Sequence, residues 1–176
     1  HDHGIGIQAS FIFGFDHDDP AVFERTVEFI HLNRIELPTF SVLTPFPGTP
    51  LWERLNHEGR IFDKDWSHYD MSRVVFVPQK MTPDRLQQGY LWAQKYSCAP
   101  RSILKRLLLG PRHHLGYFLL RNFVLRKAQM KVVNDCDQSP FLPQVFRRDL
   151  VTPMHVDIAR QGKGVYILLI EITRGV

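Results

Sequence analysis

The run GIGIQASFIFGF, residues 4–15, carries no charge and is rich in β-branched and aromatic side chains. An uncharged run of this kind is typical of a strand buried on both faces, as in a parallel sheet. Asp19 and Pro20 follow it and predict the start of a helix, with Asp19 as the N-cap and Pro20 in the first turn. We expect this helix to end near Asn33.

A second strand is predicted at residues 38–43, after a short connection. A strand, a helix and a strand joined by short links form a β-α-β unit, whose right-handed crossover makes the two strands parallel. Pro50 then opens another helix, which we expect to end at Gly59. Residues 1–60 therefore hold two β/α units. Because both edges and both faces of such strands need partners, we interpret the chain as the C-terminal part of a longer protein.

Charge is distributed unevenly over the 176 residues. The formal charge is −4 over residues 1–98, +8 over residues 99–134, which contain no Asp or Glu, and zero over residues 135–176. We therefore expect three segments with different roles. The predicted elements place the first boundary earlier than the charge does: the chain divides into the β/α units of residues 1–60, a helical extension with basic helices over residues 61–134, and an unassigned tail over residues 135–176.

Further elements are predicted inside the last two segments. Residues 74–77 favour a strand, and Thr82 with Pro83 marks the N-terminus of a helix. Two basic helices should follow, over residues 101–108 and 115–133. The tail is expected to be irregular over residues 135–163, with one more apolar strand at residues 165–172.

Composition excludes several classes of protein. Two cysteines, Cys98 and Cys136, are too few for a disulfide scaffold or for a zinc or iron–sulfur site made of cysteines in this chain alone. No apolar run reaches the roughly 18–20 residues of a membrane-spanning helix, and the N-terminus lacks a signal-peptide pattern. We therefore expect a cytoplasmic protein.

Ligands of parallel α/β folds gather beyond the carboxyl ends of the strands. That rule selects residues 14–19 after the first strand and residues 44–50 after the second. Gly14 has no side chain, so a flat ring could approach its backbone closely. The alternative is that these residues have a purely structural role, as a core strand, a glycine turn and a rigid proline turn.

Other polar groups are less specific. The acids and histidine of residues 16–19 suggest a metal site, but helix capping accounts for Asp19 without one. The same holds for His1 and His3, which precede the first strand. His68 could exchange protons with a substrate near neutral pH, although local hydrogen bonding is the more usual role. We therefore assign no metal ligand and no catalytic residue.

A family resemblance rests on longer phrases. SFIFGFDHDD (residues 10–19) and FSVLTPFPGTPLWERL (residues 40–55) together resemble the later β/α units of the radical S-adenosylmethionine (SAM) superfamily. The continuation GRIFDKDWSHYDMS (residues 59–72) and VVFVPQKMTPDRLQQGYLWAQKYS (residues 74–97) is similar to the subgroup that has a cobalamin-binding domain. The resemblance covers residues 1–109 and fades beyond them.

The resemblance implies a fold and a set of cofactors. In that family a partial (β/α) TIM-like barrel binds a 4Fe–4S cluster through a Cys-x-x-x-Cys-x-x-Cys loop, and the cluster reduces SAM to a radical that abstracts hydrogen from the substrate. This chain lacks that loop. The resemblance therefore implies that upstream residues bind the cluster and any cobalamin, while this chain is the C-terminal portion of the barrel followed by a mostly helical extension.

The resemblance also implies which residues contact SAM. Ile12, Gly14 and Phe15 match the strand whose apolar side chain and glycine pack on adenine. The next strand end, which lies near the adenine or the substrate, is matched by Leu43, Thr44 and Pro45. The family often has Pro-Gly where this chain has Asp16-His17, so contacts at that turn should differ.

Three functions remain open at this stage. The first is a fragment of a radical SAM enzyme, inactive alone, that works with the upstream part of the same protein on a small-molecule substrate. The second is a non-catalytic accessory module whose basic helices dock on a protein partner or make peripheral contact with a membrane. The third is a fragment of another, metal-dependent β/α-barrel enzyme. The second basic helix does not segregate its charge, which favours packing of this surface on the parent barrel over binding to a membrane, and nucleic acid is not an expected partner.

Overall fold

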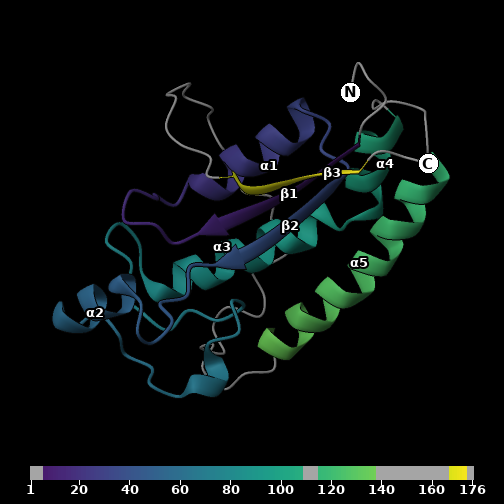
Figure 1. Cartoon of the computed structure of the whole chain (residues 1–176). Helices are drawn as coiled ribbons and strands as arrows, with labels where there is room; N and C mark the ends of the chain where they lie inside the picture. The colour runs from purple at the N-terminus through teal and green to yellow at the C-terminus, as the bar shows by residue number, and fades with distance from the viewer. Residues whose placement is uncertain (1–5, 109–114, 138–166, 174–176) are drawn as a thin grey trace.

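The computed structural model describes residues 6–108, 115–137 and 167–173, and this part of the chain is an α/β fold (Figure 1). The first elements are β1 (Gly6–Phe13), α1 (Val22–Leu32) and β2 (Leu37–Val42). β1 and β2 are parallel, and Phe13 stands opposite Val42. The predicted β-α-β unit is confirmed.

β3 (Ile167–Thr173) completes the described sheet. It pairs antiparallel with β1, so the strand order is β2-β1-β3. A strand was predicted at residues 165–172 and is confirmed with slightly shifted bounds. Most of the segment predicted as irregular, residues 138–163, lies outside the described residues. At the outer edge of β2, the N–H of Val42 donates to the carbonyl of Met71 at 2.8 Å.

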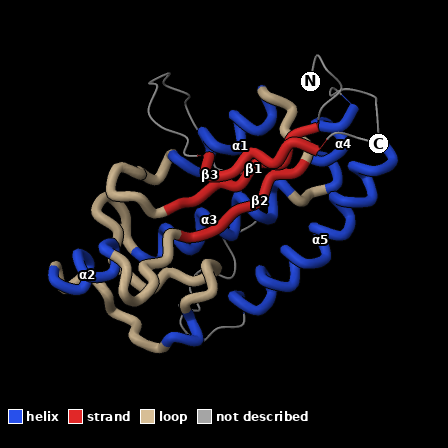
Figure 2. The backbone as a smooth tube through the Cα atoms, viewed as in Figure 1, coloured by secondary structure: helices blue, strands red, loops and turns tan. Residues whose placement is uncertain are grey.

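Helices pack against one face of this sheet. The tube view places α1 and α3 (Pro83–Ser97) behind the strands (Figure 2). The rings of Phe11 and Phe13 stack on Phe40, with centroids 5.8 and 5.9 Å apart, and Phe23 of α1 meets Phe13 edge to face at 4.8 Å. All four rings are buried. Because side chains alternate along a strand, this aromatic core fixes which residues face away from the helices.

The opposite face of the sheet is polar and partly exposed. It carries Ser10, Ile12, Thr39 and Ser41, each of them half-buried among the described residues. The hydroxyl oxygens of Ser10 and Thr39 lie 2.7 Å apart in a cross-strand hydrogen bond. The prediction that the first strand is buried on both faces is therefore wrong for the described structure. The uncharged run concealed an alternation of Gln, Ser and Ile with Ala and Phe.

The helix starts follow their capping residues in two cases of three. α2 (Pro50–His57) and α3 each begin after a threonine whose side-chain oxygen accepts a backbone N–H at 3.2 Å, from Trp52 to Thr49 and from Arg85 to Thr82. The predicted N-cap at Asp19 is wrong. Its carboxylate accepts the N–H of Ala21 at 3.0 Å, while a turn places the start of α1 after Ala21.

The strand predicted at residues 74–77 is also wrong. These residues form one antiparallel bridge, between Phe76 and Ile61, within the described chain. The N–H of Val74 donates to the side chain of Gln87 at 3.0 Å instead of to a strand. The predicted burial is confirmed for Val74 and Phe76. The backbone pairing is too short for a strand, because it rests on the N–H of Phe62 donating to Val75 at 3.2 Å and the N–H of Val77 donating to Arg60 at 2.8 Å.

The two predicted basic helices are confirmed. α3 is followed by α4 (Pro100–Leu108) and α5 (Leu115–Asp137), which continues past the predicted end at Val133. A buried guanidinium holds these helices to the sheet: Arg106 donates to Asn122 at 3.3 Å, and Asn122 donates to the carbonyl of Glu36 at 3.0 Å. Within the described residues, no helix combines the length and apolarity needed to cross a bilayer.

Candidate functional site

The carboxyl ends of β1 and β2 lie side by side, as parallel pairing requires. The N–H of Leu43 donates to the carbonyl of Phe13 at 2.8 Å, and a Cβ added to Gly14 would stand 3.5 Å from Cβ of Leu43. The six residues predicted to contact SAM therefore form two adjacent segments. They are Ile12, Gly14 and Phe15 at the end of β1, and Leu43, Thr44 and Pro45 at the end of β2.

The turn after β1 is built around Asp18. Its Oδ2 accepts the backbone N–H of Gly14 at 2.8 Å and that of Phe15 at 3.0 Å. Asp18 is only 3% exposed, and burial raises the pKa of its carboxyl above the usual range although both N–H groups act in the opposite direction. Asp18 therefore shapes the candidate site from inside the fold.

Gly14 is required by this turn for two reasons. Its φ of +109° lies in a region that favours glycine, and a Cβ there would come within 2.9 Å of Cδ2 of Leu86 and 3.4 Å of the ring of Phe76. The helix side of Gly14 is thus filled by the core. Gly14 is itself buried, so a ligand ring could approach this turn only over the half-exposed side chain of Ile12 on the opposite face of the sheet.

The segment after β2 is more self-contained. Thr44 is buried, and its hydroxyl donates to the carbonyl of Val42 at 3.1 Å. Pro45 is buried and Leu43 is half-buried. The hydroxyl hydrogen of Thr44 is thus used within the protein, and only its oxygen lone pairs remain for a ligand.

An ion-pair network at the same end of the sheet was not predicted. Asp16 accepts hydrogen bonds from Arg54 at 2.7 Å and from Arg60 at 2.9 Å. Partial burial would raise the pKa of Asp16, but the hydrogen bonds and charges of the two arginines outweigh it and hold that pKa below its usual value. Partners so distant in sequence leave no local pattern, so the residues alone could not reveal the network.

Asp16 is therefore engaged with arginines. Among the described residues, no group of three or more His, Cys, Asp or Glu side chains is arranged to hold a metal ion. His1 and His3 lie outside the described residues.

His68 bonds locally, as its more usual role predicts. Its Nδ1 lies 2.6 Å from Oδ2 of Asp63, and the hydroxyl of Tyr69 donates to the carbonyl of the same aspartate at 2.7 Å. Trp66, in the short 3-10 helix η1 (Trp66–His68), packs on Tyr69 with ring centroids 5.0 Å apart and is 54% exposed. Trp66 and Tyr69 belong to residues 59–72, one of the phrases that carry the family resemblance.

The two cysteines do not fit an iron–sulfur cluster. Cys98 and Cys136 are both buried and free. Cys98 donates to the side chain of Gln129, and Cys136 lies 3.7 Å from the hydroxyl of Ser72. The chain has no other cysteine, and each of these two thiols is bonded within the fold.

Comparison with known proteins gives the family. Residues 49–113 match a family model described as a domain of unknown function, DUF4070. Over 132 residues the chain is 39% identical to the bacteriochlorophyllide d C-12(1)-methyltransferase of Chlorobaculum tepidum, covering 75% of this chain and 28% of the relative. Over 104 residues it is 40% identical to the hopanoid C-2 methylase of Rhodopseudomonas palustris, covering 59% and 19%. The chain belongs to the B12-binding radical SAM family.

Membership of the radical SAM family agrees with the resemblance carried by the strand-end motifs. A more distant relative is the anaerobic magnesium-protoporphyrin IX monomethyl ester cyclase of Cereibacter sphaeroides, 29% identical over 87 residues, which cover 49% of this chain and 14% of that protein. The chain spans less than a third of the length of each of these three relatives. No solved structure gives a significant match.

Proposed function

We propose that this chain forms the C-terminal wall of a partial (β/α) barrel in a radical SAM enzyme, and that the ends of β1 and β2 contact the adenosyl group of SAM. The observation that carries this proposal is the adjacency of the Gly14 turn and Leu43 at the end of a parallel strand pair. The half-exposed sheet face that carries Ile12 leads to the same end. Such strand ends are where α/β folds bind ligands.

The chemistry of the turn suits an adenine ring better than a phosphate. The N–H groups of Gly14 and Phe15 are already bonded to Asp18, so they are not available as donors to an anion. What this end of the sheet offers a ligand is the half-exposed apolar side chain of Ile12, next to a buried glycine that adds no side chain of its own. Bound SAM would supply the radical that starts the reaction; this chain would orient its adenosyl group.

The surroundings of the strand ends favour a large apolar substrate. Phe46, in the loop after β2, is 43% exposed, and Met71, beside the outer edge of β2, is 50% exposed. Trp66, five residues before Met71 in the sequence, is also exposed. Two relatives are named for bacteriochlorophyllide and hopanoid methylation. We infer that the complete protein transfers a methyl group to a ring compound of comparable size and low polarity.

The proposed barrel requires a different pairing of β1 from the one in this structure. Inside a parallel barrel both edges of β1 would pair with parallel strands, whereas β3 pairs antiparallel with one of them. An upstream strand and β3 would compete for that edge. In the complete protein we therefore expect β3 to leave β1.

The experiment uses the complete protein, encoded by the reading frame that contains this chain, with its cluster reconstituted anaerobically. The readout is the cleavage of SAM to 5′-deoxyadenosine as a function of SAM concentration. Ile12→Arg places a charge on the open sheet face and should raise the KM for SAM at least about tenfold, because an adenine contact is lost. Leu32→Arg, at a position 73% exposed on α1, is the matched control and should leave the KM unchanged.

Two results would contradict the proposal. One is an upstream sequence without a Cys-x-x-x-Cys-x-x-Cys motif. The other is an unchanged KM in Ile12→Arg. The non-catalytic accessory module remains the alternative, and it predicts that no form of the complete protein cleaves SAM.

A further inference from the structure

The outer surface of α4 and α5 carries a row of large apolar side chains. Each is between 45% and 64% exposed: Leu104 and Leu108 on α4, and Tyr117, Leu120, Phe123 and Val124 on α5. We call these six residues the α4–α5 face. Surfaces of this kind usually contact something, because isolated apolar residues are common on proteins but grouped ones are not.

Helical spacing places these residues away from the fold. On α4, Ile103 and Leu107 are buried, so the residues that follow each of them, Leu104 and Leu108, lie on the outer side. On α5, Phe118 and Asn122 are buried under the helix. Residues 117, 120 and 124 follow helical spacing along its outer side. The face therefore belongs to helices that are already docked by their inner sides.

Cations surround this face, and acids are absent from it. Residues 99–134 contain eight Lys and Arg and no Asp or Glu. Arg101 and Lys105 alternate with the exposed leucines of α4, and on α5 the ammonium of Lys127 lies 4.9 Å from the ring centroid of Phe123. No carboxylate of the described residues forms an ion pair with Arg101, Lys105 or Lys127.

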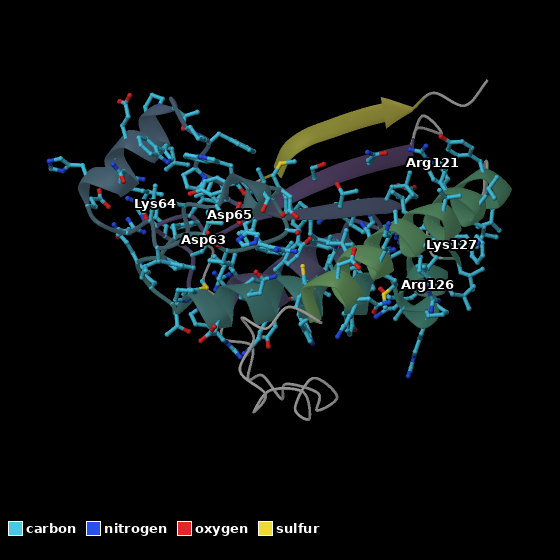
Figure 3. The ribbon with its side chains drawn as sticks, turned by 90° about the horizontal axis from the view of Figure 1, so that it is seen from below. Asp63, Lys64, Asp65, Arg121, Arg126 and Lys127 are labelled. Atoms are coloured by element: carbon cyan, nitrogen blue, oxygen red, sulfur yellow. The ribbon has the colours of Figure 1, made fainter. Side chains whose placement is uncertain are left out.

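The charged residues are distributed unevenly between the two ends of the molecule. Figure 3 shows Arg121, Arg126 and Lys127 at one end of the molecule, and Asp63, Lys64 and Asp65 toward the other end. The basic end therefore presents one sign of charge together with exposed apolar groups. A surface that could bind this end must be negatively charged and must have an apolar layer below its charged groups.

We propose that the α4–α5 face docks on the surface of a bilayer that contains anionic phospholipid. The apolar side chains would enter the boundary between headgroups and acyl chains, and the flanking cations would bind the phosphates. A second copy of the chain fits less well, because a two-fold contact would set these cations against one another without a carboxylate between them. The docking surface is independent of SAM binding at the strand ends.

The test is co-sedimentation of the 176-residue chain with vesicles. One set contains equal parts of phosphatidylserine and phosphatidylcholine, and the other phosphatidylcholine alone. We expect binding to the first set, loss of binding at high salt, and at most weak binding to the second. Reversal of two charges, Lys105→Glu with Lys127→Glu, should weaken binding at least about tenfold, since each basic residue near an anionic surface contributes severalfold.

A second variant tests the apolar part, and a third serves as the control. Leu120→Ser with Phe123→Ser should reduce binding severalfold while circular dichroism stays unchanged, because both side chains are exposed. Lys64→Glu with Lys80→Glu changes the same net charge at exposed positions outside the face and should leave binding intact.

Four outcomes with the 176-residue chain overturn the proposal. They are no binding to either vesicle set, equal loss of binding in the control variant, binding that ignores both phosphatidylserine and salt, and a dimer of the free chain that Leu120→Ser with Phe123→Ser dissociates. The assay is repeated on the complete protein. If the complete protein does not bind vesicles although the chain does, an upstream segment covers the face and the proposal fails.

Discussion

Oδ2 of Asp18 lies 2.8 Å from the backbone nitrogen of Gly14, and this contact fixes the turn that ends β1. The carboxylate also accepts the N–H of Phe15 at 3.0 Å. Because Asp18 is buried, it has exchanged water for these two donors. The shape of the candidate SAM site thus depends on a residue that faces away from it.

Replacement of Asp18 should therefore be costly. We expect Asp18→Ala to lower the free energy of unfolding by about 2–3 kcal/mol, because two buried N–H groups lose their acceptor. Asp18→Asn keeps a carbonyl oxygen in place and should cost less, about 1 kcal/mol. Urea unfolding followed by circular dichroism measures both. Equal losses in the two variants would mean that the acceptor oxygen is not what stabilises the turn.

The difference in unfolding free energy between the wild type and Asp18→Asn should depend on pH. The pKa of Asp18 is raised in the folded chain, chiefly by burial, so the folded state holds this proton more tightly than the unfolded state does. The stabilisation is fully present below the unfolded pKa of about 3.9 and is lost as the pH rises through the folded pKa. The advantage of the wild type over Asp18→Asn should therefore shrink as the pH increases from about 3 to neutrality. An advantage that grows over this range would show that the pKa is lowered.

Gly14→Ala and Gly59→Ala separate backbone strain from packing. Both glycines have positive φ, +109° and +68°, but a Cβ at position 14 would come within 2.9 Å of Leu86, while nothing lies within 4 Å of one at position 59. Gly59→Ala should cost about 1 kcal/mol. Gly14→Ala should cost about 2–4 kcal/mol, since overpacking is added to strain. Similar unfolding midpoints for the two variants would rule out the predicted clash.

The elements that sequence could predict are those set by local chemistry. The parallel pair follows from two apolar runs joined through one helix, and the starts of α2 and α3 follow from Thr-Pro capping signals. A general property of parallel sheets predicts that residues 14–19 and 44–50 lie together, and the family resemblance narrows these segments to residues 12, 14, 15 and 43–45. The family resemblance added which ligand to expect there.

The elements that sequence could not predict depend on distant partners. Nothing near residues 167–173 indicates that β3 joins β1, and nothing near Asp16 indicates Arg60, whose side chain lies 2.9 Å away. The failed strand at residues 74–77 has the same cause. An apolar run predicts burial, but a strand also needs continuous pairing. Here the pairing is limited to one bridge with Ile61, and Gln87 accepts the N–H of Val74.

Gly89 marks the tightest approach of α1 and α3. A Cβ added to it would lie 2.1 Å from Cε2 of Phe23, a ring that is only 3% exposed. Although alanine is the better helix former, we expect Gly89→Ala to destabilise the chain by about 1–3 kcal/mol, because the buried ring has to move. Gly116→Ala is the matched control on α5: nothing lies within 4 Å of its Cβ, so it should stabilise by about 0.5 kcal/mol. Thermal unfolding of both variants decides, and a gain in Gly89→Ala would refute the close packing.

The two cysteines should be unreactive in the folded chain, although they are free thiols. Burial raises the pKa of Cys98 to about 11 and also raises the pKa of Cys136. At about pH 8 the thiolate of Cys98 is therefore only about a thousandth of the total, roughly a hundredfold less than in an unfolded chain. Reaction with a disulfide reagent should be at least about a hundredfold slower in the native protein than in guanidinium.

Single-thiol variants extend this test to the docking of α5. Cys98→Ser leaves Cys136 alone, near the end of α5 and 3.7 Å from the hydroxyl of Ser72, whereas Cys136→Ser leaves the thiol that bonds to Gln129. If α5 is docked along its whole length, each single-thiol chain reacts slowly, because the thiol becomes accessible only when the whole chain unfolds. Fast labelling of Cys136 with an unchanged circular dichroism spectrum would show that the C-terminal turns of α5 detach from the segment containing Ser72 while the rest of the fold persists.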